Sequence, residues 1–242
     1  MIQISLSRIS VVIVLSAAAC SVVPATAGVQ QAPKAESKTA MPSGTYKVSG
    51  ANKLNGKEEF KITQTADRAT IETSGELNEA HGTRSTKTRL ELEKGKLFRY
   101  WASATTGPAQ RNYTIEFGAD SAQVKIESGP DKSERTLQVP ADAILLDNDV
   151  WAQYQPLLAR YDMAKKGVQN FTIFVPGGGL RVYNAQVEFE GTIAYDLHGR
   201  KVAASNFVVM LADAYEVDIV ADQTGLPLRV ERYFDNKKAV LQ

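Results

Sequence analysis

Few side chains in this protein have the types and spacing that catalysis requires. The 242 residues include two histidines, His81 and His198, and one cysteine, Cys20. Each histidine precedes a glycine, which is typical of a turn. The sequence has neither the H-E-x-x-H motif of zinc proteases nor the G-x-S-x-G motif of hydrolases. We therefore predict no catalytic residue, no metal ligand and no cofactor, although a serine, a histidine and an aspartate could still meet in space as a hydrolase site.

Two other polar segments suggest ligand loops. Three consecutive glycines, Gly177 to Gly179, suggest a phosphate-binding loop, but such a loop needs a following helix and a Lys-Ser/Thr pair. The residues Leu180 to Tyr183 predict a strand instead, so we interpret the glycines as a hairpin turn. Asp147-Asn148-Asp149 offers oxygen ligands for calcium but lacks the glycine and the distal glutamate of an EF-hand loop. We interpret Asp147 or Asn148 as the N-cap of a helix.

The aromatic residues are the remaining candidates for a binding site. They are spread over several predicted strands and one predicted helix, and they either form ordinary core or line an apolar cavity. Under the second interpretation, a curved sheet with a helix across its mouth would leave a hydrophobic cleft of ligand size. The candidate ligand-binding residues are then Trp101, Trp151, Tyr154, Phe171 and Phe189.

Alternation of apolar and polar residues predicts the strands that would carry these side chains. The pattern is clear at 113–117, 183–189 and 215–219, and each such segment predicts a strand with one face in the core. Turn signals such as Asn55-Gly56, Lys94-Gly95 and His198-Gly199 separate about a dozen short strands. The predicted fold class is mainly β: an antiparallel meander that forms a half-open barrel or strongly curved sheet, with one amphipathic helix.

The predicted helix spans Asn148 to Lys166. Its apolar residues, from Val150 to Tyr161, fall at helical spacing, so Trp151 and Leu158 should be buried against the sheet. Pro156 should either kink this helix or begin a second one after a short first turn. Lys165 and Lys166, followed by glycine, predict the C-terminal end.

The N-terminus has the pattern of a secretory signal peptide. Arg8 is followed by an apolar segment and by Ala25-Thr26-Ala27, a cleavage site of the A-x-A type. We predict a signal peptide at 1–27, a flexible linker at 28–43, and a single β-rich domain at 44–242. Cys20 follows three alanines, which leaves lipidation at Cys20 as an alternative. The protein would then be an outer-membrane lipoprotein instead of a free periplasmic or secreted one.

Composition excludes some classes of partner. The net charge is +1, from 28 basic and 27 acidic residues, so there is no basic excess for nucleic acid. Cys20 is the only cysteine, so the predicted domain has no disulfide and depends on packing for its stability. Contact with a membrane is expected only if Cys20 is lipidated.

A segment near the C-terminus resembles a known group of proteins. Val217 to Ala221 reads as a strand, Asp222-Gln223-Thr224-Gly225-Leu226-Pro227 as a turn, and Leu228 to Glu231 as another strand. With the signal peptide, the meander and the helix, this segment is similar to periplasmic half-barrel proteins of the lipoprotein-carrier and sigma-factor-regulator group, and to secreted domains of unknown function. The resemblance implies a half-barrel that shelters acyl chains behind helices, and no site residue carries over from it.

These patterns together predict an exported, non-enzymatic envelope protein that binds an apolar, lipid-like ligand in a curved β-sheet. Two alternatives stay open. One is an envelope interaction module whose edge strands bind another protein. The other is a hydrolase whose site is assembled in space.

Overall fold

The computed structural model describes residues 42–80 and 82–242. The predicted signal peptide, Cys20, most of the predicted linker and His81 lie outside the described residues. The β-rich part begins with a strand at Ser43, one residue before the predicted boundary. No helix among the described residues is long and apolar enough to cross a bilayer.

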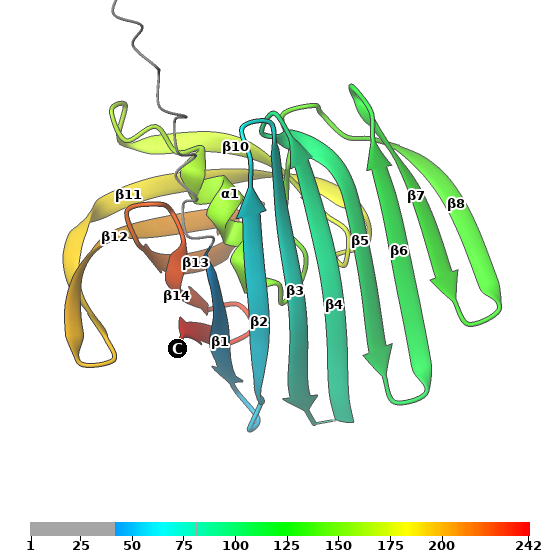
Figure 1. Ribbon diagram of the computed structural model, residues 1–242, viewed down its shortest axis with the longest axis horizontal. Coiled ribbons are helices and arrows are strands. Elements are labelled where there is room, and N and C mark those ends of the chain that lie inside the picture. The colour runs from blue at the N-terminus through cyan, green and yellow to red at the C-terminus, as the bar shows by residue number, and fades with distance from the viewer. Residues whose placement is uncertain (1–41, 81) are drawn as a thin grey trace, which may run out of the picture. The chain divides into compact units, whose positions relative to one another are not determined.

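Fifteen strands form one sheet in the described part of the chain (Figure 1). Its order is β8-β7-β6-β5-β4-β3-β2-β1-β15-β14-β13-β12-β11-β10-β9. The strands are β1 Ser43–Gly50, β2 Asn55–Gln64, β3 Arg68–Glu79, β4 Gly82–Glu93, β5 Lys96–Thr106, β6 Ala109–Phe117, β7 Ser121–Ser128, β8 Asp131–Gln138, β9 Ile144–Leu145, β10 Val168–Val175, β11 Arg181–Leu197, β12 Arg200–Leu211, β13 Tyr215–Ala221, β14 Pro227–Arg232 and β15 Lys237–Leu241.

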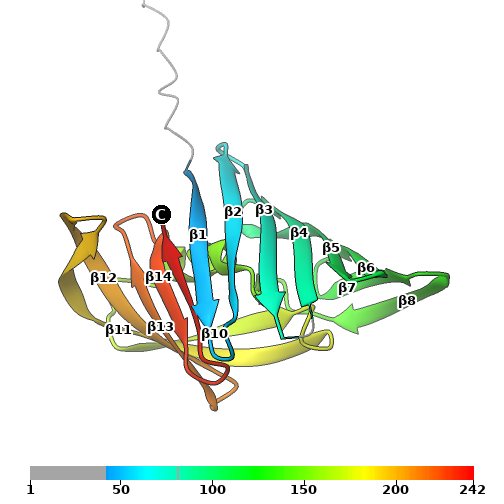
Figure 2. The same ribbon diagram turned by 90° about the horizontal axis from the view of Figure 1, so that it is seen from below.

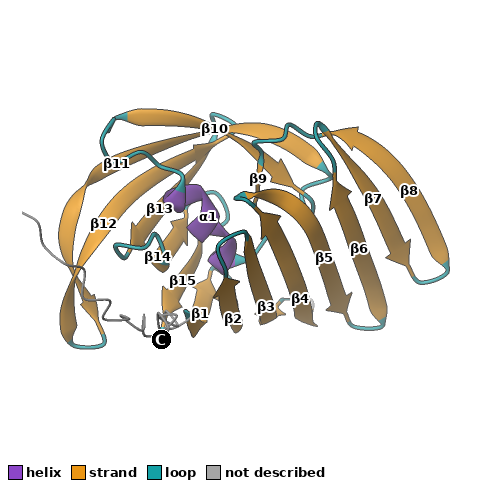
Figure 3. Cartoon of the chain, turned by 45° about the horizontal axis from the view of Figure 1, so that its top comes forward, coloured by secondary structure: helices purple, strands orange, loops and turns teal. Residues whose placement is uncertain are grey.

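The topology is two meanders joined through the first and last strands. β1 pairs with β15 in antiparallel register, and Figure 2 shows these two strands side by side in the middle of the sheet. All neighbours are antiparallel except β9 and β10. The sheet curves strongly, and its end strands, β8 and β9, do not pair with each other, so it does not close into a barrel (Figure 3). The predicted fold class is confirmed in its curved-sheet form.

One predicted turn is wrong, and a close backbone approach explains why. Asn55 and Gly56 begin β2, whereas the turn before them is made by Asn52 and Lys53, which have φ values of 54° and 63°. A side chain at Gly56 would collide with the carbonyl oxygen of Glu76 on β3. Glycine is therefore required at this strand position for packing, and the Asn-Gly pair is not a turn signal here.

The helical segment is shorter than predicted. A 3-10 turn, η1 (Trp151–Gln153), leads into α1 (Tyr154–Ala159), so neither the predicted start nor the predicted end is correct. Pro156 lies in the first turn of α1, which confirms the predicted second helix after a short first turn. The chain leaves the helix before Asp162, whose carboxylate accepts the N–H groups of Ala164 and Lys165 and so favours a turn over another helical turn.

The helical segment lies on the inner side of the curved sheet (Figure 3). Trp151 and Leu158 are 1% and 4% exposed, which confirms their predicted burial, and both belong to the main hydrophobic core. Glu58 on β2 connects this segment to the sheet, because its two carboxyl oxygens accept the N–H groups of Trp151 and Ala152, each at 3.0 Å. The concave side of the sheet is therefore largely filled by the protein's own side chains.

Candidate ligand-binding site

The five predicted ligand-binding aromatics do not converge on one pocket. Trp151 and Tyr154 are buried in the core and fill the space that was expected to be a cavity. Phe171 and Phe189 are half-buried and pack against that core. Trp101 is 39% exposed and points to the outer face of β5, because its neighbours Tyr100 and Ala102 point inward. Of the five, two are therefore core residues, two are half-buried against the core, and one lies on the outer face.

Three pockets instead meet at Asn148, in the segment that leads into η1. The apolar cleft has a volume of about 320 Å³, the charged pocket about 320 Å³, and the polar trough about 340 Å³. Asn148 lines all three of them. Phe234 is shared by the apolar cleft and the charged pocket, and Arg84 by the charged pocket and the polar trough. One continuous surface therefore offers apolar, charged and polar groups around a single short segment.

The apolar cleft is built by strands from the C-terminal meander. Its main side chains are Ile173 and Val175 from β10, Tyr183 from β11, Leu211 from β12, Tyr215 from β13 and Phe234 from the β14–β15 turn. The rings of Tyr215 and Phe234 meet edge to face, with 5.0 Å between centroids. These two aromatic side chains are 47% and 45% exposed, so they present apolar surface that a ligand could cover.

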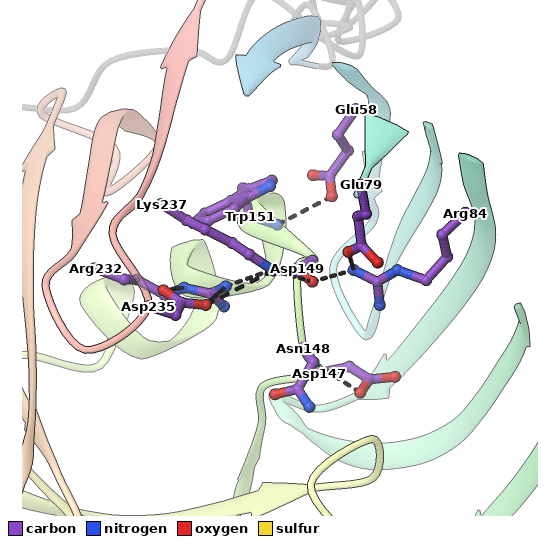
Figure 4. A network of polar contacts seen from close by, with 10 residues as sticks. All are labelled: Glu58, Glu79, Arg84, Asp147, Asn148, Asp149, Trp151, Arg232, Asp235 and Lys237. Carbon is purple, nitrogen blue, oxygen red and sulfur yellow. Dashed lines mark hydrogen bonds and ion pairs between the residues drawn. The ribbon is translucent and has the colours of Figure 1, made fainter. Parts of the chain in front are cut away.

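The charged pocket is organised by Asp149, as Figure 4 shows. Its carboxylate accepts hydrogen bonds from Arg84 and Arg232 and from Lys237 Nζ, the last at 2.9 and 3.0 Å. Burial by itself would raise the pKa of Asp149, but attraction to Arg232, Lys237 and Arg84 outweighs burial and lowers the pKa to about 2. Asp149 is therefore ionised at every physiological pH.

Arg232 connects this network to the core. Its guanidinium lies 4.6 Å from the ring centroid of Trp151 and 5.3 Å from that of Phe234, and it also pairs with Asp235 at 2.6 Å. Arg84 makes a further ion pair with Glu79 at 3.3 Å. Three cations thus face three carboxylates, so the charged pocket has little net charge to attract an ionic ligand.

Asp147 has a structural role that differs from the predicted helix cap. Its carboxylate accepts bonds from the hydroxyl of Tyr100 at 2.6 Å and from the N–H groups of Asn148 and Gly177, both at 2.8 Å. Burial raises the pKa of Asp147, while these three donors act in the opposite direction. Neither η1 nor α1 has a side-chain cap, so the N-cap interpretation of Asp147 and Asn148 is wrong.

The three glycines form the turn between β10 and β11, as the hairpin interpretation predicted. A side chain at Gly177 would collide with Asp147 Oδ1, the atom that accepts the Gly177 N–H. A side chain at Gly178 would come within 2.8 Å of Val175. The glycines therefore let this turn lie close against the segment that separates the polar trough from the apolar cleft.

Replacing Gly177 with alanine should lower the free energy of unfolding by about 1–3 kcal/mol, because it would disturb a hydrogen bond to a buried carboxylate. Gly75 on β3 is the matched control, because its backbone is not left-handed and a side chain there would make only an ordinary contact, 3.5 Å from the carbonyl oxygen of Lys57. Urea denaturation of the two alanine variants would test this. A loss at Gly75 as large as the loss at Gly177 would contradict the close-packing argument.

Of the two histidines, only His198 lies in the described part of the chain. His198 lies in the turn between β11 and β12, with φ 53°, and its Nε2 is 3.1 Å from the carbonyl oxygen of Leu241. Within residues 42–80 and 82–242 no group of three or more His, Cys, Asp or Glu side chains is arranged to hold a metal ion.

Comparison with known proteins adds little to this picture. No protein-family model matches the chain, and no curated protein matches it. Among solved structures, a DUF1089 family protein from Pseudomonas aeruginosa is similar, with a TM-score of 0.49 and 10% sequence identity. The similarity covers 86% of this chain and 95% of that chain. At this level it carries no argument about function, so the function has to be inferred from the site itself.

Proposed function

We propose that this protein is an exported, non-enzymatic envelope protein that binds an apolar, lipid-like ligand. The single observation that carries the proposal is the apolar cleft with its exposed Tyr215 and Phe234, directly beside two polar pockets. Its volume of about 320 Å³ is near the lower end of the usual range for ligand sites, roughly 300–1,000 Å³. Export is supported by the signal-peptide pattern at 1–27.

The size of the cleft sets the expected affinity. Burial of apolar surface contributes about 25 cal/mol per Å². Immobilising a flexible chain opposes binding, as does the loss of translational freedom. An acyl chain of which only part enters the cleft should therefore bind with a dissociation constant on the order of micromolar.

The test is binding of a hydrophobic fluorophore, with displacement by an acyl lipid. We expect about one fluorophore per chain and weaker binding in a Tyr215→Ala variant, by about tenfold. That factor is ~1.4 kcal/mol, the free energy of burying roughly 55 Å² of apolar surface. Trp101→Ala is the matched control, because Trp101 is a similarly exposed aromatic on the outer face of the sheet. The proposal fails if the folded protein binds no probe, or if both variants lose binding equally.

A second candidate function rests on β8. All of its residues except Leu137 are exposed, and among the described strands nothing pairs with its outer edge. Such an edge can accept a strand from another protein, as in an envelope interaction module. Its charged residues Lys132, Glu134 and Arg135 are of the kind that protect edges from pairing, which is why we place this function second.

A further inference from the structure

The polar trough lies on the inner face of the N-terminal meander, and the strand register explains its shape. One row across β4, β5, β6 and β7 is large and apolar: Leu90, Tyr100, Ile115 and Val124. Two rows further along the same face, the partners are Thr86, Ala104, Arg111 and Ser128. The sheet is therefore covered by large side chains beside η1 and becomes hollow where Thr86, Ala104 and Ser128 replace them.

Two arginines border this hollow from opposite sides. Arg84 projects from β4 and Arg111 from β6, with Ala104 and Thr106 on β5 between them. The backbones of β4 and β6 are two strand spacings apart, about 10 Å, and both arginines line the trough between them. Arg111 takes part in none of the ion pairs between described residues and lies over the ring of Tyr113, 4.9 Å from its centroid.

Two unused polar groups also line or border the trough. Arg84 Nε is buried and has no hydrogen-bond partner among the described residues, although its Nη2 is engaged by Asp149 and Glu79. Tyr113 is only 8% exposed and its hydroxyl makes no side-chain hydrogen bond with another described residue. The carboxylate of Asp147 adjoins the trough, but three donors already satisfy it. The trough thus offers donors and an unpaired cation, which suits an anion.

We propose that the ligand is an anionic single-chain amphiphile, whose acidic headgroup binds between Arg84 and Arg111 while its chain enters the apolar cleft. This inference rests on the proposed function. The two pockets are neighbours: Asn148 lines both, and Gly177 of the trough is followed by Gly178 of the cleft. A ligand crossing the Asn148–Gly177 boundary would therefore place a charged end and an apolar end in matching surroundings. A carboxylate and a phosphate share the required chemistry.

The experiment compares dodecyl phosphate, an uncharged dodecyl maltoside and inorganic phosphate, each below its aggregation concentration, as competitors of a hydrophobic fluorophore. We expect dodecyl phosphate to bind about tenfold more tightly than the maltoside, the size expected for one charge-assisted contact. In Arg111→Gln this preference should disappear while maltoside binding is unchanged. Arg99→Gln is the control, because Arg99 is an exposed arginine of β5 that lies on the outer face beside Glu116.

The outcomes separate this inference from the proposed function. If both dodecyl compounds bind equally to the unaltered protein, the headgroup assignment is overturned and apolar binding stands. If neither binds, the proposed function itself fails. If inorganic phosphate competes as strongly as dodecyl phosphate, the trough is a site for free anions and the amphiphile is excluded.

Discussion

Replacing Asp149 with asparagine is expected to destabilise the protein by about 3–5 kcal/mol, the usual cost of removing one partner from a buried ionic network. The change leaves Arg84, Arg232 and Lys237 without the carboxylate that they share. Asparagine has the same shape and tolerates the left-handed backbone of this position, where φ is 59°. The loss would therefore report on charge and not on a strained turn.

The free energy of unfolding of the variant, measured by urea denaturation, would test this expectation. The matched control is Glu116→Gln, which removes an ion pair with Arg99 whose side chains are 59% and 47% exposed. Exposed pairs contribute about 0–1 kcal/mol, so this control should be almost neutral. Equal effects of the two substitutions would mean that the Asp149 network adds nothing to stability. Since the pKa of Asp149 is lowered, its contribution is present above pH 3.8 and is lost as the pH falls through about 2.

Glu58 should make the protein less stable as the pH rises. Its carboxyl group is buried, and burial raises its pKa from 4.5 to about 8, although the N–H groups of Ala152 and Trp151 act in the opposite direction. Between these two pH values the folded state holds a proton that the unfolded state has released. The stabilisation is therefore complete below pH 4.5 and is lost as the pH rises through about 8. The full change in the pKa of Glu58 corresponds to a change in the free energy of unfolding of roughly 5 kcal/mol at most.

The measurement is the free energy of unfolding from pH 4.5 to pH 9. Glu58→Gln should flatten the pH dependence, because an amide is neutral throughout, and it should cost some stability at low pH by weakening the contact with η1. Glu59→Gln is the control, since Glu59 is the next residue on β2 and its side chain is 56% exposed. A slope that is the same in the Glu58 and Glu59 variants would show that Glu58 is not the group that titrates.

The sequence predicted the strands well and the helix only in part. On β7, Ala122, Val124 and Ile126 are buried between exposed neighbours, which is the alternation that sequence patterns detect. The apolar spacing from Val150 to Tyr161 correctly predicted burial. It failed at the helix ends. The carboxylate of Asp147 binds Gly177, which belongs to a later turn. Asp162 bonds to the nearby N–H groups of Ala164 and Lys165 and also to Gln169 of β10.

The candidate site could not be predicted from sequence spacing. Asp149 meets Arg84 across 65 residues and Lys237 across 88, and no local motif marks such partners. Tyr215 begins β13 directly after a turn, and Phe234 lies within the turn between β14 and β15, where an aromatic residue gives no distinctive signal. By contrast, the sequence predicted Trp151 and Tyr154 as ligand-binding residues because they are large aromatics at helical spacing. That spacing marks them as residues of the core.

The sequence by itself determined which side of the alternating strands, such as β6 and β7, faces the core, because alternation is a local property with a period of two residues. It also determined that a short amphipathic segment interrupts the strands. Only the tertiary structure decided that β1 pairs with β15, that the sheet stays open, and that the inner face is filled beside η1 but hollow between Arg84 and Arg111. These features depend on long-range strand pairing and register, because a side chain fills a cavity or lines one according to which distant neighbours the register places against it.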